Sequence, residues 1–232
     1  MQFHRMREDG TAESYNWSGY AVTGSSFTKV LGSWTVPTVN CTTTPNAYAA
    51  FWVGLDGYSS STVEQTGTDS DCDGERAQYY AWYEFYPANS FVITSLLISP
   101  GNTISASITY SGSEFTTTIT NVTTGKSYSK SSTVPGAKRS SAEWIAEAPC
   151  CTNRGGILPL SNFGTVSFGL DYTKVASTNY AAEGSGNSMP ISAFGTSSVQ
   201  ELIMVSNGGA EEAIPSALTT DGSSFTVAWK SE

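Results

Sequence analysis

The chain has 232 residues and a formal net charge of −9 at pH 7, but only 13% of its residues are charged, about half the share of an ordinary soluble domain. The scarcity of Lys and Arg argues against a nucleic-acid partner, and 39% hydrophobic residues argue against disorder. The single histidine, His4, lies in a polar N-terminal stretch, which excludes triads and zinc hydrolases that need an imidazole inside the fold.

Short segments rich in Thr, Val, Tyr and Trp, bounded by Gly, Pro, Asn or Ser, run along the whole chain and predict strands. In chain order they are 19–23, 29–36, 49–55, 62–68, 78–86, 103–110, 114–121, 141–147, 165–171, 201–206 and 225–229. Helical periodicity is weak and confined to 197–204. The pattern predicts an all-β fold, a two-sheet antiparallel β-sandwich of the jelly-roll or concanavalin-like kind.

We expect one β-sandwich domain over residues 14–232, preceded by a flexible segment over 1–13. No apolar run reaches the length of a membrane span, so no membrane partner is expected. An even number of cysteines predicts two disulfides in an oxidising compartment, hence a secreted protein. Their pairing stays open among three arrangements, one of which joins adjacent residues: the cysteines are Cys41, Cys72, Cys150 and Cys151.

Hydroxyl side chains supply most of the polarity, with 35 Ser and 29 Thr in the chain. These groups form hydrogen bonds without titrating, and few bases are present to repel one another in acid. The composition therefore suggests acid tolerance. A Ser- and Thr-rich secreted β-protein of no particular pH preference is the simpler interpretation.

The densest aromatic run lies at 78–87, within a predicted strand. Strand alternation places Trp82, Glu84 and Tyr86 on one face together with Tyr80. A carboxylate is costly to bury without partners, so this face is a candidate ligand-binding cleft. A strand with one solvent face fits the segment equally well.

Two further segments combine an aromatic residue with acids. In 51–57, Trp52 and Asp56 alternate with an apolar set that faces the core. In 141–149, Glu143 and Glu147 share a face, as general acid/base work by carboxylates would require. Two solvated surface acids would give the same pattern.

Taken in order, five segments resemble the glutamic peptidase, or eqolisin, family. They are NWSG at 16–19, WVGLDG at 52–57, QTG at 65–67 followed by Asp69, AWYEFYP at 81–87 and AEWIAE at 142–147. Each segment is weak alone, whereas five in the correct order are quite specific. They cover most of the first two-thirds of the chain.

The resemblance implies two antiparallel sheets of about seven strands each, with a cleft on a concave face. It also implies a catalytic pair formed by Gln65 and Glu147, no metal or cofactor, and a non-catalytic position for Glu143. The residues implied to bind substrate are Asn16, Trp17, Trp52, Asp56, Trp82, Glu84 and Tyr86.

The implied activity is that of an acid endopeptidase on polypeptides, insensitive to pepstatin and independent of metal. An ionised Glu147 would take a proton from a water molecule, Gln65 would donate to the developing oxyanion, and Glu147 would then protonate the leaving amine. A carboxylate acting near its ordinary pKa predicts an optimum at about pH 2–4. We expect a monomer.

The chain departs from the family pattern in three ways. The interval from Asp56 to Gln65 is one residue shorter, which implies a reshaped loop. Tyr80 stands where the family has an acid, which puts a subsite preference or the pH profile in doubt. The cysteines are placed differently, so the family's disulfides do not carry over.

Two alternatives stay open at this stage. A jelly-roll glycoside hydrolase would use two carboxylates such as Glu84 and Glu147, about 5–9 Å apart, beneath aromatic platforms. A lectin-like sandwich would stack Trp and Tyr rings on sugar and would hydrolyse nothing. Gln65 has no role in either one.

Overall fold

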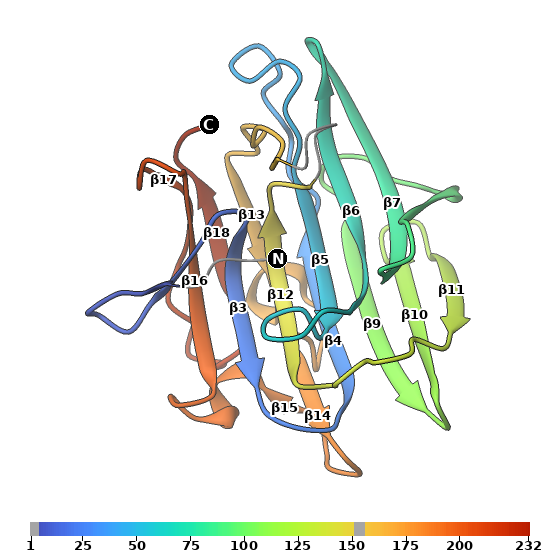
Figure 1. Ribbon diagram of the computed structural model, residues 1–232. Helices are drawn as coiled ribbons and strands as arrows, with labels where there is room; N and C mark the ends of the chain where they lie inside the picture. The colour runs from blue at the N-terminus through green and yellow to red at the C-terminus, as the bar shows by residue number, and fades with distance from the viewer. Residues whose placement is uncertain (1–4, 151–155) are drawn as a thin grey trace.

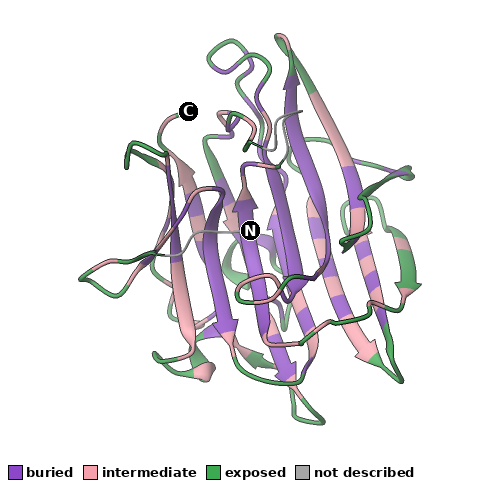
Figure 2. Ribbon diagram, in the orientation of Figure 1, coloured by how far each residue is buried: buried purple, intermediate pink, exposed green. Residues whose placement is uncertain are grey.

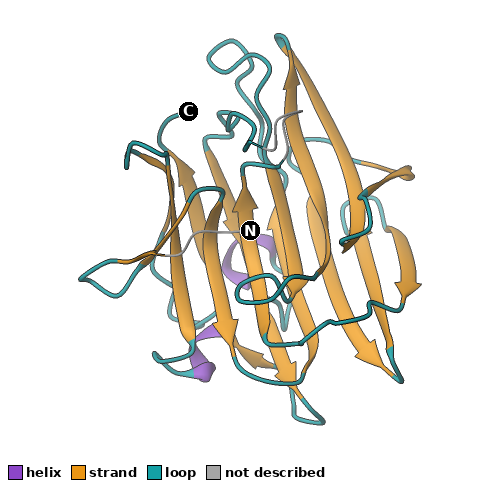
Figure 3. Cartoon of the chain, in the orientation of Figure 1, coloured by secondary structure: helices purple, strands orange, loops and turns teal. Residues whose placement is uncertain are grey.

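The computed structural model describes residues 5–150 and 156–232, which form two β-sheets packed face to face (Figures 1 and 3). The front sheet has the strand order β8 (Phe91–Leu97), β7 (Arg76–Tyr86), β6 (Val63–Asp73), β5 (Ala50–Leu55), β12 (Ser141–Glu147), β3 (Trp17–Thr23) and β16 (Val199–Val205). All neighbours in this order are antiparallel, as the sequence predicted.

The back sheet has the order β11 (Lys126–Ser132), β10 (Glu114–Asn121), β9 (Thr103–Ser111) and β4 (Phe27–Thr35). The far side of β4 pairs with β14 (Tyr180–Glu183) and then β13 (Thr165–Phe168), and β13 is followed by β18 (Phe225–Trp229) and β17 (Glu211–Pro215). Because β17 also pairs with β16, the two sheets are joined along one edge.

The remaining elements are short: β1 (Arg5–Met6), β2 (Ala12–Ser14), β15 (Met189–Pro190), the helix α1 (Leu170–Thr173) and a 3₁₀ turn (Ile191–Phe194). Two expectations from the sequence are corrected. The strand predicted over 165–171 ends at Phe168, because Gly169 adopts φ 97° and α1 follows. The weak helical pattern over 197–204 belongs to strand β16, which pairs with β3 and β17.

Alternation along the front strands divides their side chains between two faces. Phe51, Val53 and Leu55 point into the core between the sheets, where Trp144 donates its indole N–H to the backbone oxygen of Leu31 across the interface. The opposite face carries a second cluster of buried side chains, which we call the site face: Ala12, Trp17, Ala21, Ala50, Trp52, Trp82, Ile145 and Leu202. Figure 2 accordingly colours β3, β12, β5 and β6 as buried almost throughout.

Most of the N-terminal stretch expected to be flexible, residues 1–13, lies in the described part of the chain. Residues 5–14 form a hairpin in which β1 pairs with β2, and β2 runs parallel to β16. The Arg7 guanidinium bridges Glu13 at 2.7 Å and Glu211 at 2.9 Å. The pairing of β2 with Leu202–Met204 of β16 buries Ala12 completely. Residues 1–4 lie outside the described part of the chain.

The structure shows part of the disulfide pairing. A disulfide joins Cys41 to Cys72, with a Cα–Cα distance of 5.4 Å, which is one of the arrangements the sequence left open. Cys150 is also disulfide-bonded. The alternative that pairs it with Cys151 falls outside the described residues. None of the helices within 5–150 and 156–232 has the length and apolarity needed to cross a membrane.

Candidate active site

Glu147 lies at the end of β12 on the site face. Its Oε1 accepts a hydrogen bond from Asn16 Nδ2 at 3.0 Å, and its Oε2 accepts one from Trp52 Nε1 at 2.6 Å. Trp17 packs edge-on against Trp52 with ring centroids 4.8 Å apart. Three residues that the sequence selected therefore surround one carboxyl group, and two of them fix its orientation.

Trp52 links this carboxyl group to Gln65. Its indole nitrogen contacts Glu147, while its ring extends over Gly54, where an added Cβ would come within 2.9 Å of Trp52 Cζ3. The same Cβ would lie 3.3 Å from the Cβ of Gln65, the residue opposite Gly54 on β6. A glycine is required at position 54 because the indole occupies the space of a side chain. The ring thus spans from Glu147 toward Gln65.

Gln65 is held by Glu84, its partner on β7. Gln65 Nε2 donates to Glu84 Oε2 at 2.5 Å, and Gln65 Oε1 is buried without a hydrogen-bond partner among the described residues. An amide nitrogen carries two hydrogens, so the second one stays available on the site face. The structure thus places Glu84, expected to bind substrate, as the group that orients Gln65.

Substitution of Glu84 distinguishes a role in orienting Gln65 from a role in binding substrate. We expect Glu84→Ala to reduce kcat by about 10-fold to 100-fold, because the Gln65 amide loses the acceptor that fixes it. Glu84→Gln keeps an acceptor oxygen and should reduce kcat far less. Steady-state kinetics on one peptide substrate decides the matter, since a pure substrate-binding role would raise KM in Glu84→Ala and leave kcat unchanged.

Asp56 was expected to bind substrate, and the structure places it against the segment that precedes β12. It is fully buried at the end of β5, and its carboxylate accepts the backbone N–H groups of Lys138, Arg139 and Ser140 at 2.6–2.9 Å. Asp56 therefore anchors the segment that precedes β12. Tyr86 does lie at the end of β7 in the predicted alternation, with 47% of its surface exposed.

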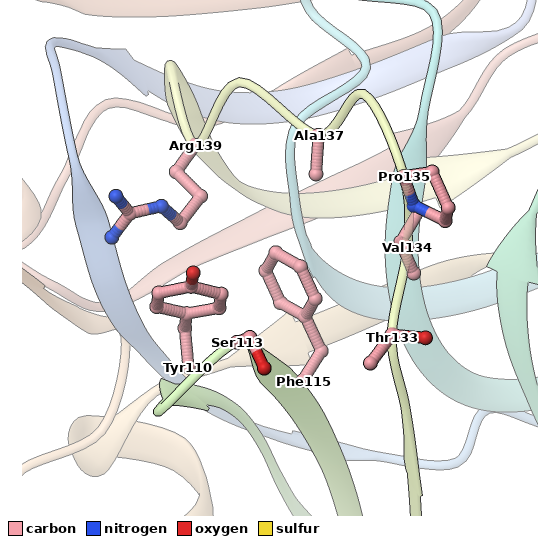
Figure 4. A pocket seen from close by; sticks show the side chains of 8 residues that line it. All are labelled: Tyr110, Ser113, Phe115, Thr133, Val134, Pro135, Ala137 and Arg139. Atoms are coloured by element: carbon pink, nitrogen blue, oxygen red, sulfur yellow. The ribbon is translucent and has the colours of Figure 1, made fainter.

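The segment anchored by Asp56 lines a separate pocket of about 280 Å³ (Figure 4). In it, the Arg139 guanidinium lies 4.1 Å from the centre of the Tyr110 ring, beside Phe115. None of the predicted site residues lines this pocket. Among the described residues, no group of three or more His, Cys, Asp or Glu side chains is arranged to hold a metal ion.

The charge state of Glu147 corrects one expectation. Burial raises its pKa to about 8, and the nearby charge of Glu84 adds to the effect, although the hydrogen bonds from Trp52 and Asn16 oppose it. The sequence-based mechanism started from an ionised Glu147 in acid. The raised pKa favours the protonated carboxyl group in acid, because burial penalises the charged form.

One cluster on the site face was not assigned from the sequence. The Tyr80 hydroxyl lies within hydrogen-bond distance of both Asp69 and Asp71, and Trp82 donates its indole N–H to Asp69 at 2.5 Å. Strand alternation carried a signal, since 65, 67, 69 and 71 share a face of β6. The short side chains of Asp69 and Asp71 become a site only when β7 brings Tyr80 opposite them.

Comparison with known proteins identifies the family of the chain. The model of the peptidase A4 family matches residues 15–208. The chain belongs to the peptidase A4 family. Aspergillopepsin-2 of Aspergillus niger is 31% identical, and Scytalidopepsin B of Scytalidium lignicola is 33% identical, over alignments that cover 68% and 74% of this chain. These alignments span 64% and 66% of the two relatives, so the chain covers slightly less than two-thirds of their length.

The A4 assignment extends to the fold. A crystal structure of scytalido-glutamic peptidase with a transition state analog inhibitor matches with a TM-score of 0.75 and 27% identity, over 93% of this chain and 98% of that one. Membership of the A4 family confirms the resemblance seen in the five sequence segments and the β-sandwich fold. The glycoside hydrolase and lectin alternatives have no comparable support.

Proposed function

We propose that the chain is a glutamic-type endopeptidase that acts on polypeptides in acid, with Gln65 and Glu147 as its catalytic residues. The observation that carries the proposal is the linked arrangement on the site face. Glu147 is oriented by Asn16 and Trp52, Gln65 is oriented by Glu84, and the Trp52 ring extends between them. Family membership supports the reaction class.

In the first step, a water molecule attacks the scissile carbonyl carbon. One oxygen of the protonated Glu147 carboxyl takes a proton from this water, while the other gives its proton to the carbonyl oxygen. The new C–O bond forms, the C=O double bond becomes a C–OH single bond, and the carboxyl group stays protonated. The free N–H of Gln65 donates to the oxygen on which charge develops.

In the second step, the tetrahedral diol collapses. Glu147 gives its proton to the amide nitrogen and takes one from a diol hydroxyl, so the C–N bond breaks and a carboxylic acid and an amine leave. The raised pKa of Glu147 suits this sequence, because the carboxyl group acts as acid and base without becoming a free carboxylate. Activity is therefore expected to require the protonated form.

The protein is proposed to act outside the cell on polypeptide substrates. The Cys41–Cys72 disulfide fits an oxidising environment, so we place the protein outside the cell. Extended polypeptide segments are the substrates, and the exposed side chain of Tyr86 is available to the residues that flank the scissile bond. The enzyme is expected to act as a monomer.

A single assay tests the reaction class. The purified protein is incubated with acid-denatured protein at pH 3, with and without pepstatin and a chelator. Cleavage at internal peptide bonds, unaffected by either compound, is the expected result, since the proposed chemistry uses one glutamate and no metal. Absence of cleavage under all conditions, or sensitivity to the chelator, would refute the proposal.

A further inference from the structure

Three oxygen-bearing side chains meet on the site face between β6 and β7. The Tyr80 hydroxyl lies 2.8 Å from Asp69 Oδ2 and 2.7 Å from Asp71 Oδ2. Both carboxyl groups are buried, and the other oxygen of Asp71 accepts the backbone N–H of Ala49 at 3.2 Å. We call these three residues the Asp–Tyr–Asp cluster.

The cluster holds one proton more than its tyrosine supplies. Two hydrogen bonds join three oxygens in a row, and each bond needs a hydrogen. The Tyr80 hydroxyl carries only one hydrogen, so either Asp69 or Asp71 must be protonated for both bonds to exist. The pair therefore carries a single negative charge. Burial raises the pKa of Asp71 to about 6, and burial together with the charge of Asp71 raises the pKa of Asp69 well above its usual range.

The Asp–Tyr–Asp cluster is connected to Glu147 by the side chains of Trp82 and Trp52. Asp69 Oδ1 accepts the indole N–H of Trp82, and Trp82 and Trp52 lie on either side of Gly67. A Cβ at Gly67 would come within 2.6 Å of Trp52 Cβ and 3.0 Å of Trp82 Cζ2, so both residues pack against this position. Trp52 in turn donates to Glu147.

We propose that Asp69, Tyr80 and Asp71 form a positioning unit, held together by one shared proton, that keeps Trp82 and Trp52 in place and thereby orients Glu147. The inference rests on the proposed catalytic role of Glu147. It also gives a role to Tyr80, the residue at which this chain departs from the family pattern. The three residues do not touch the reacting atoms and act only through the two tryptophans.

Loss of the shared proton would damage the site in two ways. One of the two Tyr80 hydrogen bonds would disappear, and two buried carboxylates would face each other. Glu147 on β12, two strands away from β6, is the titratable group of another strand whose charge acts on Asp69, so its surroundings would gain a negative charge. The residues directly paired with the cluster are uncharged, namely Ala50 on β5, Gln78 opposite Asp71 and Leu97 on β8 opposite Tyr80. The next pair on this face, Asp73 with Arg76, carries one charge of each sign. Activity should therefore fall as the proton leaves.

The test compares Tyr80→Phe with Asp71→Asn. Tyr80→Phe removes both hydrogen bonds and is expected to lower kcat by about 10-fold to 100-fold with little change in KM. In Asp71→Asn, the side-chain amide supplies the second hydrogen permanently while its oxygen still accepts from Ala49. We expect this variant to lower kcat far less and to move the alkaline limb of the kcat profile up by about one pH unit. Tyr79→Phe, whose hydroxyl accepts the Val39 N–H on the core face, is the matched control.

A second readout does not depend on catalysis. The indole N–H resonance of Trp82, identified with Trp82→Phe, should shift with pH as the shared proton is lost, and should stop shifting in Asp71→Asn. Wild-type kcat, pH profile and indole titration in both Tyr80→Phe and Asp71→Asn would overturn the inference. Should Tyr80→Phe fail to fold, Asp71→Asn still decides. Retained activity in Glu147→Gln would instead defeat the proposed function, while the indole titration would still test the cluster.

Discussion

Glu147→Gln is expected to lower kcat by about 10²-fold to 10⁴-fold, because its side chain has no proton that can be exchanged between water, carbonyl oxygen and leaving amine. The glutamine still accepts a hydrogen bond from Asn16 or Trp52, so the site face should keep its shape. Gln65→Ala is expected to lower kcat by about 10²-fold to 10³-fold through loss of a donor to the developing oxyanion. Single-turnover kinetics at pH 3 on one peptide measures both changes.

The control variant for this prediction lies outside the site. Glu75→Gln, in the exposed turn between β6 and β7, changes a carboxyl group without touching the site. The double variant of Glu147 and Gln65 should lose less than the product of the two single losses, since both residues act on one transition state. Turnover near the wild-type rate in either single variant, with the fold preserved, would remove that residue from the catalytic pair.

The second large effect concerns stability at high pH. Glu64 and Glu143 are completely buried, and neither of their carboxyl groups makes a hydrogen bond of good geometry within the described residues. Burial raises the pKa of Glu64 to about 8, with the charge of Asp56 adding to it. Burial likewise raises the pKa of Glu143 well above its usual range. The nearby hydroxyls of Thr62 and Ser141 offset these shifts only in part.

The raised pKa values of Glu64 and Glu143 determine how the free energy of unfolding changes with pH. A carboxyl group whose pKa is higher in the folded than in the unfolded state binds more protons when the protein is folded. Its contribution to the stability of the folded state is therefore complete below the unfolded pKa of about 4.5, and it is lost as pH rises. For Glu64 the loss extends to about pH 8 and amounts to about 3–5 kcal/mol. That is a large part of the 5–15 kcal/mol typical of a folded domain, so we expect unfolding at neutral to mildly alkaline pH.

Denaturant unfolding at a series of pH values measures this effect. Glu64→Gln and Glu143→Gln replace the titrating groups by neutral side chains of the same shape, so the free energy of unfolding should fall less between pH 4.5 and 8 in each variant. Glu75→Gln, which is exposed, should follow the wild type. A wild-type free energy of unfolding that is independent of pH, or higher at pH 8 than at pH 4, would contradict the prediction.

The low content of charged residues also favours stability in acid. Within the described residues the ion pairs are those of Arg7 with Glu13 and Glu211. Hydroxyl pairs take their place along β10 and β11, where Thr116, Thr118 and Thr120 each lie 2.8 Å from a serine hydroxyl. Such bonds do not titrate, whereas acid would break ion pairs. This arrangement supports the acid tolerance suggested by the composition.

Strand alternation predicted several groupings correctly, because side chains of a strand alternate between faces whatever the strand packs against. It placed Trp82 and Glu84 together, separated Trp52 from Phe51, and put Glu143 on the same face as Glu147. Alternation could not tell that Asp56 holds a loop, because that depends on backbone N–H groups more than 80 positions away.

The sequence by itself determined the fold class, the family resemblance and the absence of any histidine-based chemistry. Those conclusions follow from composition, local periodicity and short segments, which are properties of neighbouring residues. Only the tertiary structure decided which carboxyl groups keep their protons and which partners orient Gln65 and Glu147. Burial and hydrogen bonding set a pKa, and both arise when strands far apart in the chain are packed side by side. The sequence thus gives the number of acidic residues, whereas the surrounding sheet determines the protonation state and the role of each one.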